Sequence, residues 1–109
     1  MKIITYIAVS LLALSAASVR AGSAQENWNK DCAQCHGKTG AADTKMGKKL
    51  NAKDLTDAKT QASFTDAEAA KAIKEGMKEN GKTVMKAFGD KLSDEEVAAL
   101  VAYVRTLKK

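Results

Sequence analysis

Apolar side chains recur at helical spacing most clearly near the end of the chain. The residues Val97, Leu100, Val101, Val104 and Leu107 follow one another at intervals that place them on one face of a helix. Ser93 and Glu96 precede this run as a capping box, and Lys108 and Lys109 suit the negative end of a helix. The pattern predicts a terminal helix over residues 93–107.

Two more helices are expected earlier in the chain. Thr65 opens a second capping box before an alanine-rich stretch, and Gly76 is a natural stop for that helix. Asn27 to Cys35 has the pattern of a first helix, whereas glycines break the helical spacing in residues 37–47, which we interpret as loop. No stretch has a convincing strand pattern. The sequence therefore predicts an all-α domain with three main helices.

The start of the chain has the features of an export signal. A positive charge precedes an apolar run over residues 3–17, which is shorter than the roughly 18 to 20 residues that span a bilayer. Small residues then allow cleavage after Ala21, with Ala24 as the alternative, and a retained anchor is the competing interpretation. We predict a signal peptide over 1–21, one domain over 22–109, and a periplasmic mature protein without membrane insertion.

Both cysteines and the only histidine lie within five residues, as Cys32, Cys35 and His36. This C-x-x-C-H spacing is the attachment signature of a c-type haem, in which two thiols form thioether bonds and the imidazole binds the iron. In a helix the three side chains share one face. We therefore predict one covalently bound haem c, with Cys32 and Cys35 as its anchors and His36 as an axial iron ligand.

Other uses of a C-x-x-C pair fit this chain less well. A zinc site needs at least one more Cys or His, and the chain has none outside the motif. A dithiol redox protein needs strands around the motif, and a disulfide across three positions closes too small a loop to stabilise much by chain entropy. A haem-free exported helical domain with that disulfide stays the structural alternative.

The size of the mature chain also favours a buried cofactor. Cleavage after Ala21 leaves 88 residues with one Trp, one Tyr and two Phe, so a core made of protein alone would be marginal. A haem would supply the missing apolar surface. We expect the haem-free chain to be largely unfolded.

The second axial ligand has several candidates. The chain has no second histidine, which leaves the sulfur atoms of Met46, Met77 and Met85, with a lysine or water as weaker ligands. Met46 follows the motif too closely to reach the opposite haem face easily, and Met77 just after Gly76 is expected to pack in the core. Met85 stands in a connecting segment rich in Lys and Gly, so we favour Met85 as the ligand.

Three segments of the chain together resemble a family, the small class I single-haem cytochromes c of bacteria. Residues 28–37 are similar to the family's first helix and haem site, and residues 84–92 to the loop that carries its axial methionine, which corresponds to Met85. Residues 93–107 are similar to its terminal helix. The resemblance implies a cytochrome c fold of three main helices around one haem, a terminal helix that crosses the first, and Tyr103 packed near the tryptophan of the first segment.

The chain departs from that family in having no proline. Many members have a proline directly after the axial methionine, where Lys86 stands here, so a looser loop is expected. Many also have one after the haem motif, whose carbonyl accepts a hydrogen bond from the ligand imidazole. The corresponding stretch is residues 44–47, and the sequence leaves open which carbonyl orients His36.

The resemblance implies a soluble electron carrier that passes one electron between redox proteins, and not an enzyme. The mature chain has 16 basic and 13 acidic side chains, which is no surplus of the kind that nucleic-acid binding requires. Positive charge near the motif and the methionine segment favours partners with acidic docking surfaces, or is an ordinary solvated surface; it comes from Lys45, Lys48, Lys49, Lys82 and Lys86. The rival hypothesis is an enzyme or ligand sensor whose iron keeps an open position.

Overall fold

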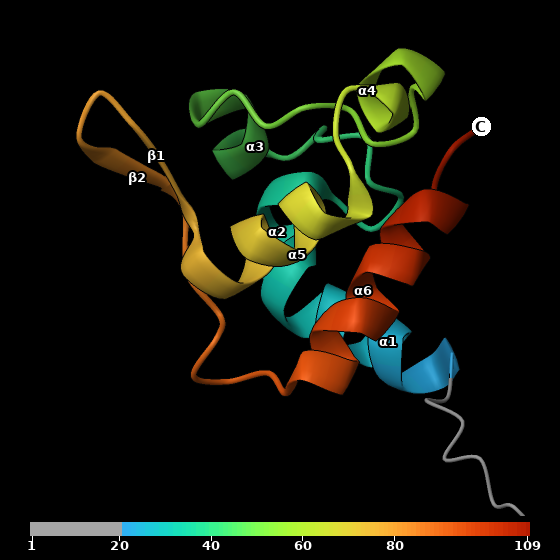
Figure 1. Ribbon diagram of the computed structural model, residues 1–109. Helices are drawn as coiled ribbons and strands as arrows, with labels where there is room; N and C mark the ends of the chain where they lie inside the picture. The colour runs from blue at the N-terminus through green and yellow to red at the C-terminus, as the bar shows by residue number, and fades with distance from the viewer. Residues whose placement is uncertain (1–20) are drawn as a thin grey trace, which may run out of the picture.

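The computed structural model describes residues 21–109, and the expected signal peptide lies outside these residues except for Ala21. Helices dominate this part of the chain (Figure 1). In chain order the elements are α1 (Ala21–Asn27), the π-helical turn η1 (Trp28–Cys32), α2 (Ala33–His36), α3 (Lys45–Lys49), α4 (Ala58–Ala62), α5 (Asp66–Glu75), β1 (Met77–Glu79), β2 (Lys82–Met85) and α6 (Asp94–Thr106). None of the helices in this range has both the length and the apolar character that crossing a membrane requires.

The first predicted helix exists, but part of it is not α-helical. The segments α1, η1 and α2 follow one another without a break, and the Ala33 N–H donates to the Trp28 carbonyl, five residues back. Both Trp28 and Cys32 are buried on this wider turn. Such π turns occur often at functional sites, and here the turn leads directly into the Cys–His motif.

Both predicted capping boxes are confirmed. The Thr65 hydroxyl accepts a hydrogen bond from the Glu68 N–H, and the Glu68 carboxylate accepts one from the Thr65 N–H, each 3.1 Å long. Ser93 and Glu96 make the same reciprocal pair at the start of α6. The amides that a helix leaves unpaired at its first turn are thus satisfied, so α5 and α6 begin where the sequence predicted.

The sequence predicted a loop over residues 37–47. The structure corrects this prediction, because the segment contains the start of α3. Thr44 caps this helix by accepting a hydrogen bond from the Gly47 N–H at 2.9 Å. Gly47 lies in the helix because it packs against the Cys35 carbonyl, where a side chain would have no space. Gly47 therefore allows the backbones of α3 and of the motif helix to approach closely. The sequence analysis instead interpreted this glycine as a helix breaker. The short helix α4 was also not predicted.

The expectation of no strand was wrong, because β1 and β2 form an antiparallel hairpin. Its turn residues Asn80 and Gly81 have φ values of 51° and 78°. An Asn-Gly pair adopts this left-handed conformation readily and is the strongest short-range signal for a hairpin. Figure 1 shows the hairpin beside α3 and continuing from the end of α5.

The core forms where α6 lies against α1 (Figure 1). The rings of Trp28 and Tyr103 have centroids 5.6 Å apart, which confirms the predicted contact between the first and last helices. The buried residues of this core are Trp28, Cys32, Leu55, Ile73, Leu92, Val97, Leu100, Val101 and Val104. Because Cys32 is among them, the Cys–His motif is attached to the centre of the fold.

Candidate functional site

The Cys–His motif occupies the last turns of the first helical segment. Cys32 is 7% exposed, while Cys35 and His36 are half-buried. Both thiols are free, so the structure contains no disulfide between them. Burial raises the pKa of the Cys32 thiol to about 12, with smaller contributions from Asp31 and Cys35. Cys32 is therefore a neutral, apolar member of the core.

The loop after the motif holds the helix end in place. The Gly37 N–H donates to the Ala33 carbonyl and the Ala42 N–H to the His36 carbonyl, both at 2.8 Å. The Thr44 hydroxyl donates to the Cys35 carbonyl at 2.7 Å. These bonds satisfy the carbonyls that a helix leaves unpaired at its end and fix the backbone that carries the histidine.

The His36 imidazole lies against the Trp28 indole, with ring centroids 5.6 Å apart. Burial lowers the pKa of His36, which favours the neutral ring that binds a metal through its lone pair. Its Nδ1 atom is the buried side-chain nitrogen or oxygen of residues 21–109 that lacks a hydrogen-bond partner. In the stretch considered for orienting this ring, residues 44–47, the carbonyls of Thr44, Met46 and Gly47 accept backbone N–H groups.

The three candidate methionines differ in their surroundings. Met85, the last residue of β2, is half-buried and packs against the core cluster that contains Cys32. Its partner in the hairpin register is Met77, which is 48% exposed, so the expected packing of Met77 in the core is wrong. Met46 on α3 is 38% exposed. Only Met85 of the three has its side chain against the core.

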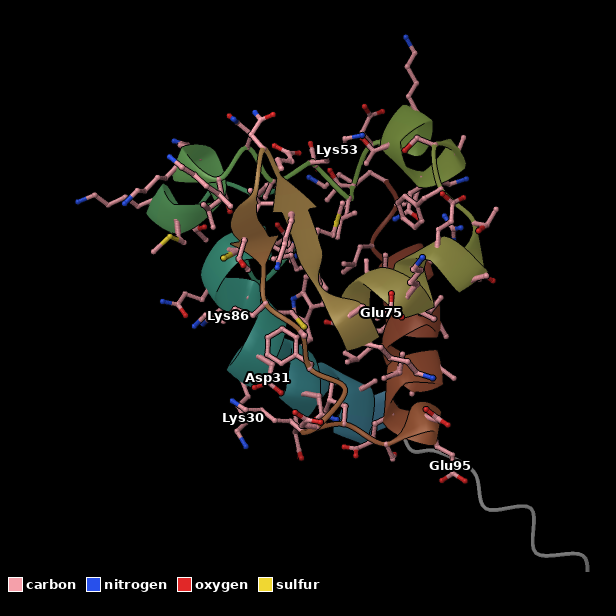
Figure 2. All side chains as sticks on the ribbon, turned by 60° about the vertical axis from the view of Figure 1, so that its left-hand side comes forward. Lys30, Asp31, Lys53, Glu75, Lys86 and Glu95 are labelled. Carbon is pink, nitrogen blue, oxygen red and sulfur yellow. The ribbon has the colours of Figure 1, made fainter. Side chains whose placement is uncertain are left out.

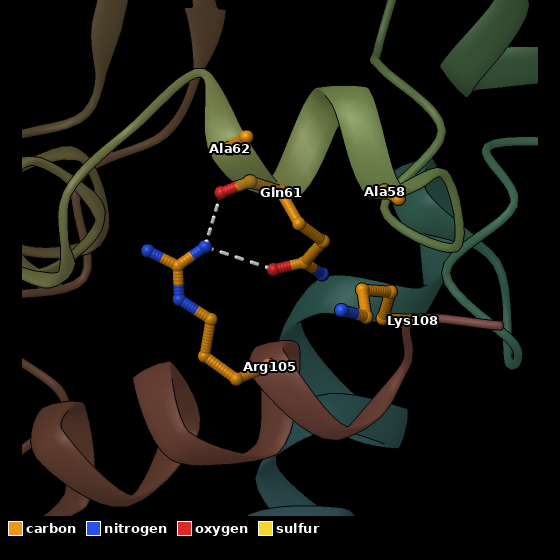
Figure 3. Close-up of a pocket in the computed structure, with 5 residues that line it drawn as sticks. All are labelled: Ala58, Gln61, Ala62, Arg105 and Lys108. Carbon is orange, nitrogen blue, oxygen red and sulfur yellow. Dashed lines mark hydrogen bonds between the residues drawn. The ribbon is translucent and has the colours of Figure 1, made fainter.

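Two surface hollows of the described residues lie outside the motif. One, of about 400 Å³, is lined by the end of α3, by Leu50 and Asn51, and by the hairpin, and includes Lys49 and Lys82. The other, of about 330 Å³, lies between α4 and the end of α6 (Figure 3). There Arg105 donates to the Gln61 side-chain oxygen at 2.9 Å and to the Phe64 carbonyl at 2.8 Å, which ties α6 to α4 and the start of α5. The second hollow thus belongs to a structural network.

Comparison with known proteins identifies the family. Residues 19–104 match the family described as cytochrome c oxidase, cbb3-type, subunit III. The chain belongs to this family of c-type cytochromes. Two solved structures are similar to the cytochrome. The "KustC0563 c-type cytochrome" is 37% identical, with a TM-score of 0.71 over 79% of this chain and 98% of that one. A point mutant of Kustc0563 is 36% identical, with a TM-score of 0.69 over 79% of this chain and 99% of that one. No curated protein matches the chain.

The family confirms the cytochrome c-like, mostly helical fold and implies haem c as the cofactor and electron transfer as the activity. The residues present fit that cofactor. Two free thiols and a neutral imidazole without a partner at its buried nitrogen come from consecutive helical turns. In residues 21–109 no three His, Cys, Asp or Glu side chains gather as a metal site would require, so a protein-only zinc centre has no ligand set there.

Sequence reasoning missed several residues that support the site. Thr44 and Gly47 secure the end of the motif helix, and the Trp28 indole donates to the Gly37 carbonyl at 3.0 Å. A threonine three residues before a glycine is a weak helix-start signal, and nothing in the sequence shows which carbonyl an indole reaches. The Asn-Gly pair at the hairpin turn was the one strong signal available.

Proposed function

We propose that this cytochrome is an exported, soluble carrier that passes single electrons between redox proteins. One haem c would be bound covalently through Cys32 and Cys35, with His36 and Met85 as the axial ligands. When bound, the haem supplies an iron that changes between the ferrous and ferric states. The packing of Met85 against the core cluster that includes Cys32 is the observation that carries the proposal.

The proposed ligand pair explains why the protein would carry electrons and not transform a substrate. With His36 and Met85 both bound to the iron, no coordination position would stay open for a substrate or gas. The soft Met85 sulfur stabilises the lower oxidation state, and burial among apolar side chains disfavours the extra positive charge of the oxidised centre. Both effects raise the reduction potential. An enzyme or sensor would instead require an open position.

The ligand assignment is tested with three methionine variants of the haem-loaded protein. We expect M85A to lose the Fe–S(Met) absorption band, to have a lower reduction potential and, when reduced, to bind carbon monoxide at neutral pH. M77A and M46A are matched controls, because they remove the same side chain from exposed positions. Loss of the band in M77A with its retention in M85A would overturn the assignment, and an intact mass without one haem would overturn covalent attachment.

Export to the periplasm is part of the proposal, since c-type cytochromes are typically exported. Ala24 is 5% exposed and belongs to α1, so cleavage after Ala21 keeps a buried residue that cleavage after Ala24 would remove. We therefore favour Ala21. N-terminal sequencing of the mature protein tests this choice.

Partners are proposed from the surface charge. The lysines of α3 and of the hairpin segment are exposed, and Lys49 and Lys82 line one groove. This arrangement would steer the cytochrome onto redox proteins with acidic docking surfaces. The name of the matched family makes a terminal oxidase one candidate, which co-purification of the native protein would test.

A further inference from the structure

The segment that follows Met85 is held by the end of α5. The Phe88 N–H donates to the Ile73 carbonyl at 2.8 Å, and the Gly89 N–H donates to the Lys74 carbonyl at 3.1 Å. Both carbonyls lie in the last turn of α5, where a helix leaves carbonyls unpaired. We call this contact of residues 73–76 with residues 85–89 the α5 clasp. The two hydrogen bonds restrain the backbone that follows Met85.

Gly76 is the tightest point of the α5 clasp. A Cβ atom added there would lie 2.5 Å from the Met85 carbonyl oxygen, 2.9 Å from the Ala87 nitrogen and 3.0 Å from the Lys86 carbonyl carbon. All three are backbone atoms, which cannot turn aside as the end of a side chain can. Gly76 also has φ 74° and ψ −174°, a conformation that is essentially restricted to glycine. Any side chain at position 76 therefore requires the backbone on one side of this contact to shift, either at Gly76 or in residues 85–87.

The opposite side of the clasp is also close. A Cβ atom at Gly89 would lie 2.9 Å from the Lys74 carbonyl oxygen, the same atom that accepts the Gly89 N–H. Lys74 is further tied to the start of α6 by an ion pair with Asp94 at 2.6 Å. Two glycines thus let the end of α5 and the segment after Met85 approach each other. Figure 2 labels Glu75, the last residue of α5, and Lys86, the residue after Met85.

We propose that Gly76, assisted by Gly89, is a positioning residue that sets where the Met85 sulfur stands relative to the cofactor. The inference rests on the proposed ligation by Met85. Met85 ends its strand where the clasp begins, so the clasp fixes the direction of the strand and of its last side chain. Because an alanine at position 76 would press on this backbone, we expect it to disturb the placement of the sulfur that would bind the iron.

A matched pair of variants separates this role from ordinary backbone strain. Gly81 also has positive φ, 78° against 74° at Gly76, but nothing lies within 4 Å of the Cβ that an alanine would add there. G76A and G81A therefore both place an alanine at positive φ, but only G76A brings that side chain against the backbone of residues 85–87. Each is prepared as the haem-loaded protein, with M85A as the reference for a lost ligand.

We expect G76A to lose the Fe–S(Met) band, to have a lower reduction potential and to bind carbon monoxide when reduced, while its far-UV circular dichroism stays helical. G81A should keep the wild-type band and potential. If G76A keeps both while M85A loses them, the clasp proposal is overturned and ligation by Met85 stands. If M85A itself keeps the band, the proposed ligation fails first.

If G76A does not fold, G89A tests the proposal in its place. Its added side chain would lie against the Lys74 carbonyl, on the other side of the clasp. Loss of the band in folded G89A supports the positioning role. A wild-type band and potential in G89A overturn it.

Discussion

Trp28 contacts both Tyr103 of the last helix and His36. Its replacement by phenylalanine should therefore lower the free energy of unfolding by a measurable amount. The indole is 2% exposed, and its Nε1–H donates to the Gly37 carbonyl at 3.0 Å. Its ring lies 5.6 Å from both His36 and Tyr103. W28F keeps an aromatic ring in the core but removes the donor and part of the buried volume.

The cost follows from these contacts. The Gly37 carbonyl keeps the Gly40 N–H as a second donor at 3.2 Å, so only the net value of one hydrogen bond is lost. That value is about 0.5–1.5 kcal/mol. The smaller ring leaves a cavity that adds roughly 1 kcal/mol. Together these terms give about 2 kcal/mol, which in a domain of this size lowers Tm by roughly 8–16 °C.

Thermal unfolding of the haem-loaded protein, followed by circular dichroism, measures this loss. Y103F is the control, because it changes a ring in the same stack and, among the described residues, no hydrogen bond involves the Tyr103 hydroxyl. We expect its stability to change by less than about 0.5 kcal/mol. A W28F protein as stable as wild type, or one no less stable than Y103F, would refute the role assigned to the indole.

Two further predictions concern charge. The Ser93 N–H and the Asn27 side chain both donate to the Glu96 carboxylate and lower the pKa of Glu96. Because the folded pKa lies below the ordinary value of about 4.3, the stabilisation is complete above that pH and is lost as pH falls through the folded pKa. The stability advantage of wild type over E96Q, measured by urea unfolding at a series of pH values, should therefore shrink below about pH 4, and a constant difference would contradict it. Steering by the exposed lysines predicts that association with the redox partner slows as ionic strength rises; rates independent of salt, measured by stopped flow, would rule it out.

The parts of the fold that were predicted correctly carry strong local signals. Capping boxes announced α5 and α6 because the reciprocal bonds of Thr65 and Ser93 need only residues three positions away. The contact of Trp28 with Tyr103 came from the family resemblance and not from spacing. The all-α class was right because these helices build the core.

The errors have identifiable physical causes. Gly47 was taken to break a helix, but it lies in α3 because it contacts the Cys35 backbone, which belongs to a different element and leaves no trace in the local pattern. The hairpin was missed because Met77, Lys78 and Glu79 have no alternation of apolar and polar side chains, and all three are exposed. The Asn80-Gly81 pair was the one local signal for this hairpin.

Some residues of the candidate site could be predicted from local sequence, whereas others depend on tertiary contacts. Cys32, Cys35 and His36 could be recognised because the whole motif lies in five consecutive positions. Met85 was preferred from the sequence because it stands in a segment rich in Lys and Gly, whereas the exposure of Met77 and the packing of Met85 against the core are tertiary properties that the sequence did not show. The glycines of the α5 clasp could not be found from sequence, since the close approaches they permit join separate elements.

The turn of the hairpin offers a practical point of attachment for electrochemistry. A Cβ atom added at Gly81 would have nothing within 4 Å, and the residues on either side of it are exposed. A peptide tag inserted there would tether the protein to an electrode through a single defined point, far along the hairpin from Met85. Immobilisation through this turn would then let direct voltammetry report the midpoint of a molecule whose iron environment has not been disturbed.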